Sequence, residues 1–82
     1  MTWTINWSFV AERRDLLALP MHTAERLDAA VIRFAQTNRG PVHRVSPHDP
    51  RRLQLVVPGA IAYLFADPDS GILLVSRVFR RG

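Results

Sequence analysis

The sequence contains no cysteine. This absence excludes a disulfide framework and every zinc site that relies on thiolate ligands. No apolar run approaches the roughly 18 residues that a membrane-spanning helix requires, so we expect no transmembrane segment. The amino-terminal stretch has neither the basic residues nor the apolar centre of a signal peptide. Together these absences predict a cytoplasmic protein that does not associate with membranes.

Lysine is absent as well, because all 11 residues in the combined lysine and arginine total are arginine. Two explanations stay open: the guanidinium group suits phosphate binding, and a GC-rich genome replaces lysine with arginine without functional meaning. The distribution is more informative. Residues 1–40 carry five arginines against four acidic residues, and residues 41–82 carry six against three. The excess positive charge, a formal +4 in total, therefore lies mainly in the second half of the chain.

With 82 residues the chain is long enough for one small domain, so we assign residues 1–82 to a single unit. No internal repeat, low-complexity segment or long linker divides it. A core of this size is close to the lower limit for independent stability, so a partner subunit would add to it. A homodimer and a hetero-oligomer both stay open.

The first part of the chain is expected to form a short strand and then a helix. Residues Trp3–Trp7 alternate between large apolar and smaller polar side chains, which is the pattern of a strand with one buried face. Ser8 is a suitable amino-terminal cap, and apolar residues recur at helical spacing over Phe9–Leu19. Pro20 ends or bends that helix.

A second helix is expected to begin near Thr23, a suitable cap, and to stop at the Gly40-Pro41 pair. Its narrow apolar stripe predicts that the two helices pack as a hairpin. Residues Val42–Ser46 then predict one further short strand.

The carboxyl-terminal third, Arg51–Arg81, has three apolar runs of strand length separated by proline, glycine and aspartate. This pattern predicts an α+β fold in which a three- to four-stranded antiparallel meander carries the helices on one face. Strict alternation divides the last strand between two faces. One face would carry Ile72, Leu74, Ser76, Val78 and Arg80, and the opposite, uncovered face would carry Leu73, Val75, Arg77, Phe79 and Arg81.

Several features occur together in an order that is typical of one known family. They are the strand Trp3–Trp7, the Arg52-Leu53 pair, Tyr63 in the next strand, the acidic turn Asp67–Gly71 and the ending Val75–Arg81. This ending is similar to an "Arg-Val-x-His/Lys-Arg" motif. Over nearly its whole length, the chain resembles the RelE/ParE superfamily of toxins from type II toxin–antitoxin systems.

The resemblance implies a RelE/ParE-like fold and a cognate antitoxin protein as partner. RelE-like members cut mRNA in the ribosomal A site, whereas ParE-like members inhibit DNA gyrase. We expect the first activity, in which a metal-independent endoribonuclease (an mRNA interferase) acts with the ribosome and mRNA as partners and uses no cofactor. Gyrase inhibition, and a catalytically degenerate module that only binds, stay open as alternatives.

Metal-free RNA cleavage needs cations that stabilise charge developing on the phosphate, and groups that accept and supply protons. Arginine suits the first task because its guanidinium can hold two phosphate oxygens. We expect the catalytic residues to be Arg52, Tyr63, Arg77 and Arg81. We expect further RNA contacts from Arg44, Arg51, Phe79 and Arg80, with Phe79 stacking on a base.

Plainer interpretations of these residues stay open beside the catalytic ones. His43 and His48 offer proton transfer, but a solvated position in or beside a loop also accounts for both. Tyr63 also fits as a core or edge aromatic residue. An antitoxin or a second copy of the chain would cover the face of Arg77.

Two departures from the nuclease pattern favour the alternatives to RNA cleavage. The arginine that RelE-like enzymes carry in the middle strand falls here at Ala60 or Ile61. The sequence also ends at Gly82, without the tyrosine or histidine found there in several nucleases of the group.

Overall fold

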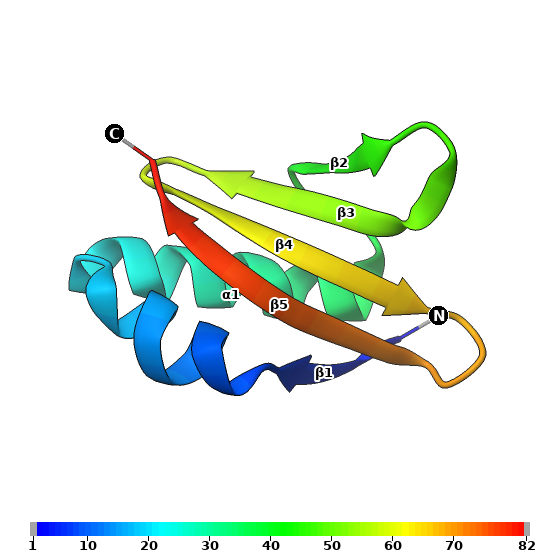
Figure 1. The fold of residues 1–82 in the computed structure, drawn as a ribbon, viewed down its shortest axis with the longest axis horizontal. Helices are drawn as coiled ribbons and strands as arrows, with labels where there is room; N and C mark the ends of the chain where they lie inside the picture. Colours follow the sequence, from blue (N-terminus) through cyan, green and yellow to red (C-terminus); the bar gives the residue numbers. More distant parts are fainter. Residues whose placement is uncertain (1, 82) are drawn as a thin grey trace.

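The computed structural model describes residues 2–81 and has the predicted α+β class. Its elements are β1 (Thr4–Trp7), a π-helical turn η1 (Ala11–Asp15), a 3₁₀ turn η2 (Leu16–Ala18), α1 (Met21–Thr37), β2 (Val42–Ser46), β3 (Asp49–Val57), β4 (Ala60–Asp67) and β5 (Ile72–Arg80). The strands form one five-stranded sheet in the order β1-β5-β4-β3-β2. Strands β2 to β5 make the expected antiparallel meander, and β1 joins its far edge parallel to β5 (Figure 1).

Helix α1 covers one face of the sheet because the residues facing it are small or aliphatic (Figure 1). Every second residue of β4 is buried on this face: Ala60, Ala62, Leu64 and Ala66. Three alanines in one strand let the helix approach the sheet closely, so that Leu27 and Val31 are fully buried. Across residues 2–81, no helix covers the opposite face, which we call the open face. No described helix is long and apolar enough to cross a membrane.

The ends of α1 differ from the predicted ones. The helix begins at Met21, directly after Pro20, so Thr23 lies inside its first turn and does not cap it. A proline there costs no hydrogen bond, because the first N–H groups of a helix have no partner within it. The helix ends at Thr37, and the residue that caps it, Asn38, has a left-handed φ of 59° and donates its N–H to the Phe34 carbonyl. It therefore stops before Gly40.

The first helical segment keeps its predicted position but not a regular winding. The expected cap is confirmed, because the Ala11 N–H donates to the Ser8 hydroxyl oxygen at 3.0 Å. The chain then winds through the π-helical and 3₁₀ turns. The segment lies beyond the end of β1, along the edge of β5 (Figure 1). This position brings Asp15 against the backbone of Val78, whose N–H donates to the carboxylate at 2.9 Å.

A bulge in β5 overturns the predicted division of that strand between two faces. Tyr63 pairs with Arg77 but Leu64 pairs with Val75, so Ser76 is an extra residue. One extra residue reverses which side chains point to which face. As a result Leu73, Val75 and Val78 are all buried towards α1. The grouping of Leu73 and Val75 with Arg77 was wrong, and so was that of Val78 with Ile72 and Leu74.

Two serine hydroxyls hold this bulge. The Ser76 hydroxyl donates to the Tyr63 carbonyl at 3.0 Å, and the Ser8 hydroxyl donates to the Ser76 carbonyl at 2.7 Å. The bulge therefore keeps its polar backbone groups paired while it returns Arg77 and Phe79 to the open face.

Candidate functional site

A row of polar side chains crosses the open face over four strands. The register pairs His43 on β2 with Gln54 on β3, Gln54 with Tyr63 on β4, and Tyr63 with Arg77 on β5. Directly paired residues of antiparallel strands point to the same face, with Cβ atoms about 5 Å apart. We call His43, Gln54, Tyr63 and Arg77 the polar row. His43 thus lies within a strand, whereas His48 lies in the β2–β3 turn, as expected.

Apolar rows border the polar row on both sides. On one side, Arg52 pairs with Phe65, and Phe65 pairs with Leu74. On the other side, Val56 pairs with Ile61, and Ile61 pairs with Phe79. Phe79 is exposed and meets the Tyr63 ring edge-on, with ring centroids 5.6 Å apart. The face therefore combines hydrogen-bonding groups with flat apolar surface, a combination that can hold the sugar–phosphate and base of a single-stranded nucleotide.

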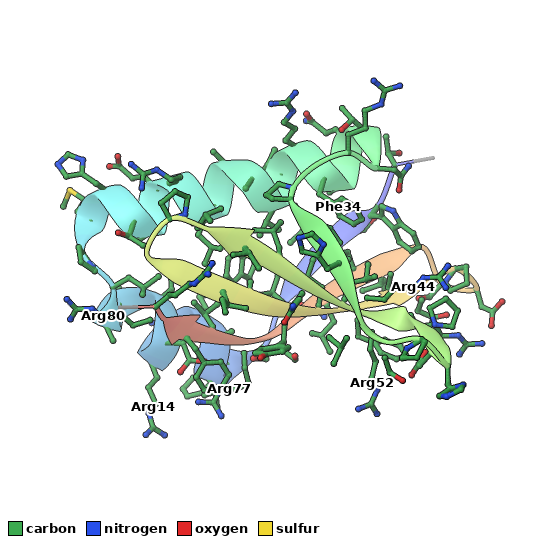
Figure 2. The ribbon with its side chains drawn as sticks, turned by 90° about the horizontal axis from the view of Figure 1, so that it is seen from above. Arg14, Phe34, Arg44, Arg52, Arg77 and Arg80 are labelled. Atoms are coloured by element: carbon green, nitrogen blue, oxygen red, sulfur yellow. The ribbon has the colours of Figure 1, made fainter. Side chains whose placement is uncertain are left out.

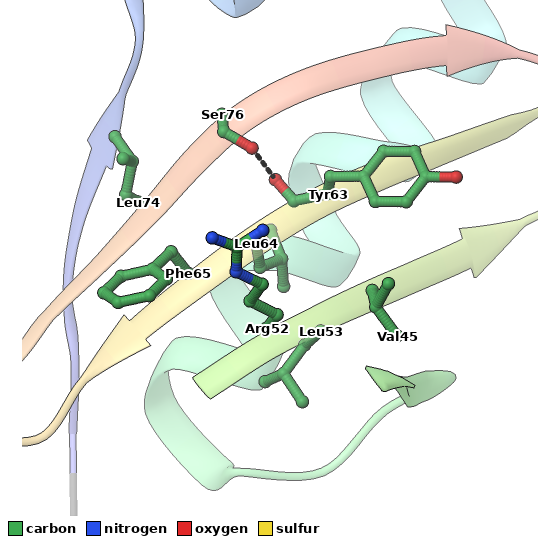
Figure 3. Close-up of a pocket in the computed structure, with 8 residues that line it drawn as sticks. All are labelled: Val45, Arg52, Leu53, Tyr63, Leu64, Phe65, Leu74 and Ser76. Atoms are coloured by element: carbon green, nitrogen blue, oxygen red, sulfur yellow. Dashed lines mark hydrogen bonds between the residues drawn. The ribbon is translucent and has the colours of Figure 1, made fainter. Parts of the chain in front are cut away.

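A shallow hollow of about 350 Å³ opens beside the polar row (Figure 3). It is lined by Val45, Arg52, Leu53, Tyr63, Leu64, Phe65, Leu74 and Ser76. Figure 3 shows Arg52 reaching from β3 across β4, while the Tyr63 ring extends in the opposite direction. The Nε of Arg52 lies 3.3 Å from a carboxylate oxygen of Asp49, but the side chains are 69% and 38% exposed. Water competes for so open a pair, so Arg52 is available to an incoming anion.

Arg77 is held far more tightly than Arg52. Its Nε donates to Oδ2 of Asp15 at 2.8 Å, and its Nη2 donates to Oδ1 at 3.3 Å. The guanidinium carbon also lies 4.8 Å from the centroid of the Phe79 ring, a cation–π contact. The Asp15 side chain is only 7% exposed, whereas that of Arg77 is 44% exposed. Arg77 is thus fixed at its inner edge and open to solvent elsewhere.

The pKa values of this pair follow from the contacts. The hydrogen bond from Arg77 lowers the pKa of Asp15 below its usual 3.8, the Val78 N–H adds to this, and burial opposes it. The same hydrogen bond to Asp15 raises the pKa of Arg77. Both groups are therefore charged at neutral pH.

The structure separates the other predicted site residues. Arg44 pairs with Leu53 on the side of α1, and Arg51 lines a second hollow of about 250 Å³ beside Trp3 and Phe34 on that side. Figure 2 shows Arg44 on the α1 side, and Arg52 and Arg77 on the other. Arg44 and Arg51, two of the three arginines predicted to bind RNA, therefore do not face the polar row.

The last two arginines lie at the far end of the sheet. Arg80 pairs with the buried Ala60 and therefore points to the side of α1, although it is exposed. Arg81 donates its N–H to the Gly59 carbonyl. Arg52 pairs with Phe65, and positions 59 and 65 are roughly 20 Å apart at about 3.3 Å per residue. The four predicted catalytic residues thus spread along the face instead of surrounding one point.

Sequence reasoning did not identify two members of this site. Gln54 could have been found, because β3 alternation places it with Arg52 on one face. Asp15 could not, since its approach to Arg77 depends on the π-helical winding of η1. Within residues 2–81, no group of three or more histidine, aspartate or glutamate side chains could hold a metal ion.

Comparison with known proteins identifies the fold of this chain, through a solved structure. No protein-family model matches the sequence, and no curated protein matches it either. Among solved structures, a chain of the toxin–antitoxin complex RelBE2 from Mycobacterium tuberculosis is similar, with a TM-score of 0.79. The match covers 99% of this chain and 100% of that one at 16% sequence identity. The predicted RelE/ParE-like fold is therefore confirmed.

Proposed function

We propose that this chain, which has the RelE-like fold, is the toxin of a toxin–antitoxin pair and arrests translation by cutting mRNA on the ribosome. The observation that carries the proposal is the polar row on a sheet face that no described helix covers. The fold match to a chain of a toxin–antitoxin complex supports the toxin role.

The proposed reaction is attack of a ribose 2′-hydroxyl on the adjacent phosphate, which leaves a 2′,3′-cyclic phosphate and a free 5′-hydroxyl. His43 accepts the proton of the 2′-hydroxyl, and Tyr63 supplies a proton to the departing 5′-oxygen. Arg77 lies next to Tyr63 within the polar row, and Arg52 lies in the neighbouring row. The two arginines stabilise the charge that builds up on the phosphate. No step requires an oxidant or a second substrate.

The flanking groups hold the RNA in place. Phe79 offers an exposed ring on which a base can stack, next to the reacting phosphate. Arg81, farther along the sheet, attracts a neighbouring phosphate of the strand. Arg44 and Arg51 lie on the other side, where they attract the ribosomal RNA that surrounds the toxin.

The proposed partner is an antitoxin that covers the open face. This face joins apolar rows to cationic side chains, so a segment with apolar and acidic residues complements it. Such a segment would exclude RNA from the polar row, which accounts for inhibition without any change of fold.

A second candidate is a toxin that binds its target, such as DNA gyrase, without cutting RNA. One observation favours it: Ala60 is buried under α1 and Ile61 forms part of an apolar row, where RelE-like nucleases have an arginine. A catalytically degenerate binding module with the same fold remains a third candidate on the same ground.

Induction of the gene alone in bacteria, followed by mapping of mRNA 5′ ends, separates these functions. RNA cleavage predicts growth arrest with new ends at A-site codons, and co-expression of the neighbouring gene should reverse it. Arrest with a DNA-damage response and no new ends would favour gyrase inhibition. Normal growth in the presence of folded protein would contradict a toxin role. Arg33→Gln, an exposed change on α1, is the matched control for Arg52→Gln.

A further inference from the structure

Asp15 is a buried carboxylate that the proposed reaction does not use directly. It comes from η1, outside the meander, yet it makes three hydrogen bonds with β5. Two of these bonds go to the Arg77 guanidinium and one goes to the Val78 N–H. Capping the Val78 N–H needs only one carboxylate oxygen, so the contact to Arg77 asks for a separate explanation.

Stability is a poor explanation for this contact. Removing a carboxylate from water costs several kcal/mol, and an ion pair recovers that cost only in part. What a two-point contact provides reliably is orientation, because a planar guanidinium bound along one edge cannot swing.

The remaining surfaces of Arg77 agree with a role in orientation. One face of the guanidinium lies over Phe79, and the Phe79 ring in turn makes a T-shaped contact with the Tyr63 ring. In the part of the chain that the structure describes, Nη1 makes no hydrogen bond. Nη1 and the second hydrogen of Nη2 form the outer edge of the fork, which can still take two phosphate oxygens.

We infer that Asp15 is a positioning residue: it holds the inner edge of Arg77 so that the outer edge is presented to the phosphate beside Tyr63. This inference rests on the proposed function. Pre-orientation raises the rate because the cation need not reorganise when charge develops on the phosphate. The position of Arg77 therefore depends on the first helical segment as well, because the π-helical turn sets where Asp15 points.

The restraint that Asp15 places on the Arg77 guanidinium can be measured without an activity assay. NMR gives the hydrogen-exchange rates of the arginine Nε–H groups. In the wild-type protein, the Arg77 signal should exchange at least about tenfold more slowly than that of Arg52, whose ion pair is exposed. Asp15→Asn should remove the difference, and Asp49→Asn should leave Arg77 unchanged. Equal exchange of the two arginines in the wild type would overturn the inference, and this comparison needs no variant.

The role in the reaction is tested by single-turnover cleavage on mRNA-programmed ribosomes at saturating protein. Asparagine at position 15 can still accept the Val78 N–H, so Asp15→Asn keeps the edge capped while it loosens Arg77. We expect cleavage to slow by about tenfold or more, with less than a twofold change in ribosome affinity. In an Arg77→Ala background, Asp15→Asn should have no further effect, because it acts through Arg77.

Two results would overturn the inference in this assay. One is cleavage by Asp15→Asn at the wild-type rate after correction for the folded fraction. The other is a double variant whose cleavage rate is reduced by the product of the reductions caused by Asp15→Asn and Arg77→Ala separately. If the wild-type protein does not cleave at all, the proposed function fails instead, and the exchange comparison alone decides whether Asp15 positions Arg77.

Discussion

The two arginines that flank Tyr63 on the open face are held in opposite ways. Arg77 is bound by Asp15 at 2.8 Å through a side chain that is 7% exposed. Arg52 lies 3.3 Å from Asp49, and the Asp49 side chain is 38% exposed. The first pair fixes its guanidinium before any ligand arrives, and the second leaves it free to follow one. A phosphate that enters this face would therefore meet one rigid and one adaptable cation.

The Asp15–Arg77 and Asp49–Arg52 pairs should differ most in the free energy of unfolding that is lost when the carboxylate is removed. Asp15→Ala leaves Arg77 and the Val78 N–H without partners, so we expect a loss of about 2–3 kcal/mol in the free energy of unfolding. Asp49→Ala should cost less than about 1 kcal/mol, because water replaces an exposed partner. Urea unfolding at neutral pH measures both. Equal losses would mean that the two ion pairs do not differ as described.

Neutralising Arg52 should lower the salt dependence of RNA binding. Arg52→Gln is expected to reduce the slope of log K against log salt for mRNA-programmed ribosomes by about 1, as for the loss of one phosphate contact. Arg33→Gln, on the exposed surface of α1, should change the slope much less, because the RNA contacts proposed for that side come from Arg44 and Arg51. An unchanged slope for Arg52→Gln would remove this residue from the phosphate site.

Acid should weaken the Asp15 pair before it affects Arg77. The pKa of Asp15 is lowered in the folded protein, so its stabilisation is complete above its usual pKa of 3.8 and is lost as pH falls through the lower folded value. The raised pKa of Arg77 keeps that group charged over the whole range. Urea unfolding from pH 7 to pH 2 should therefore show a smaller acid-induced loss for Asp15→Asn than for the wild type. Parallel curves would argue against the ion pair.

The smallest expected effect concerns the ring beneath Arg77. Phe79→Leu keeps an apolar side chain but removes the cation–π contact and the edge-on contact with Tyr63. We expect a loss of about 0.5–1.5 kcal/mol in the free energy of unfolding and faster exchange of the Arg77 Nε–H. An unchanged exchange rate would show that Asp15 alone holds the guanidinium.

The strands could be predicted from the sequence because local patterns determine them. The alternation of Trp3–Trp7 and the Pro58-Gly59 and Asp67–Gly71 turns defined the sheet, and Ser8 was found as a cap. These signals act over a few residues, where side-chain period and turn chemistry decide the outcome.

The features that build the site depend on contacts between distant segments. The bulge at Ser76 is held by Ser8 and by the Tyr63 carbonyl, and no period-two pattern reveals an extra residue. Asp15 and Arg77 are 62 positions apart, and they meet only because η1 runs along the edge of β5. The register of β2 on β3 places His43 beside Gln54, a pairing that the strand predicted over Val42–Ser46 could not reveal by itself.

Cleavage of mRNA by the purified chain on programmed ribosomes tests the central claim most directly. We predict that the wild-type protein and Arg33→Gln produce a new 5′-hydroxyl end at the A-site codon, and that His43→Ala, Tyr63→Phe and Arg52→Gln each reduce its rate by about 100-fold or more while they remain folded. Cleavage by all three open-face variants at the wild-type rate would contradict the assignment of the reaction to this face.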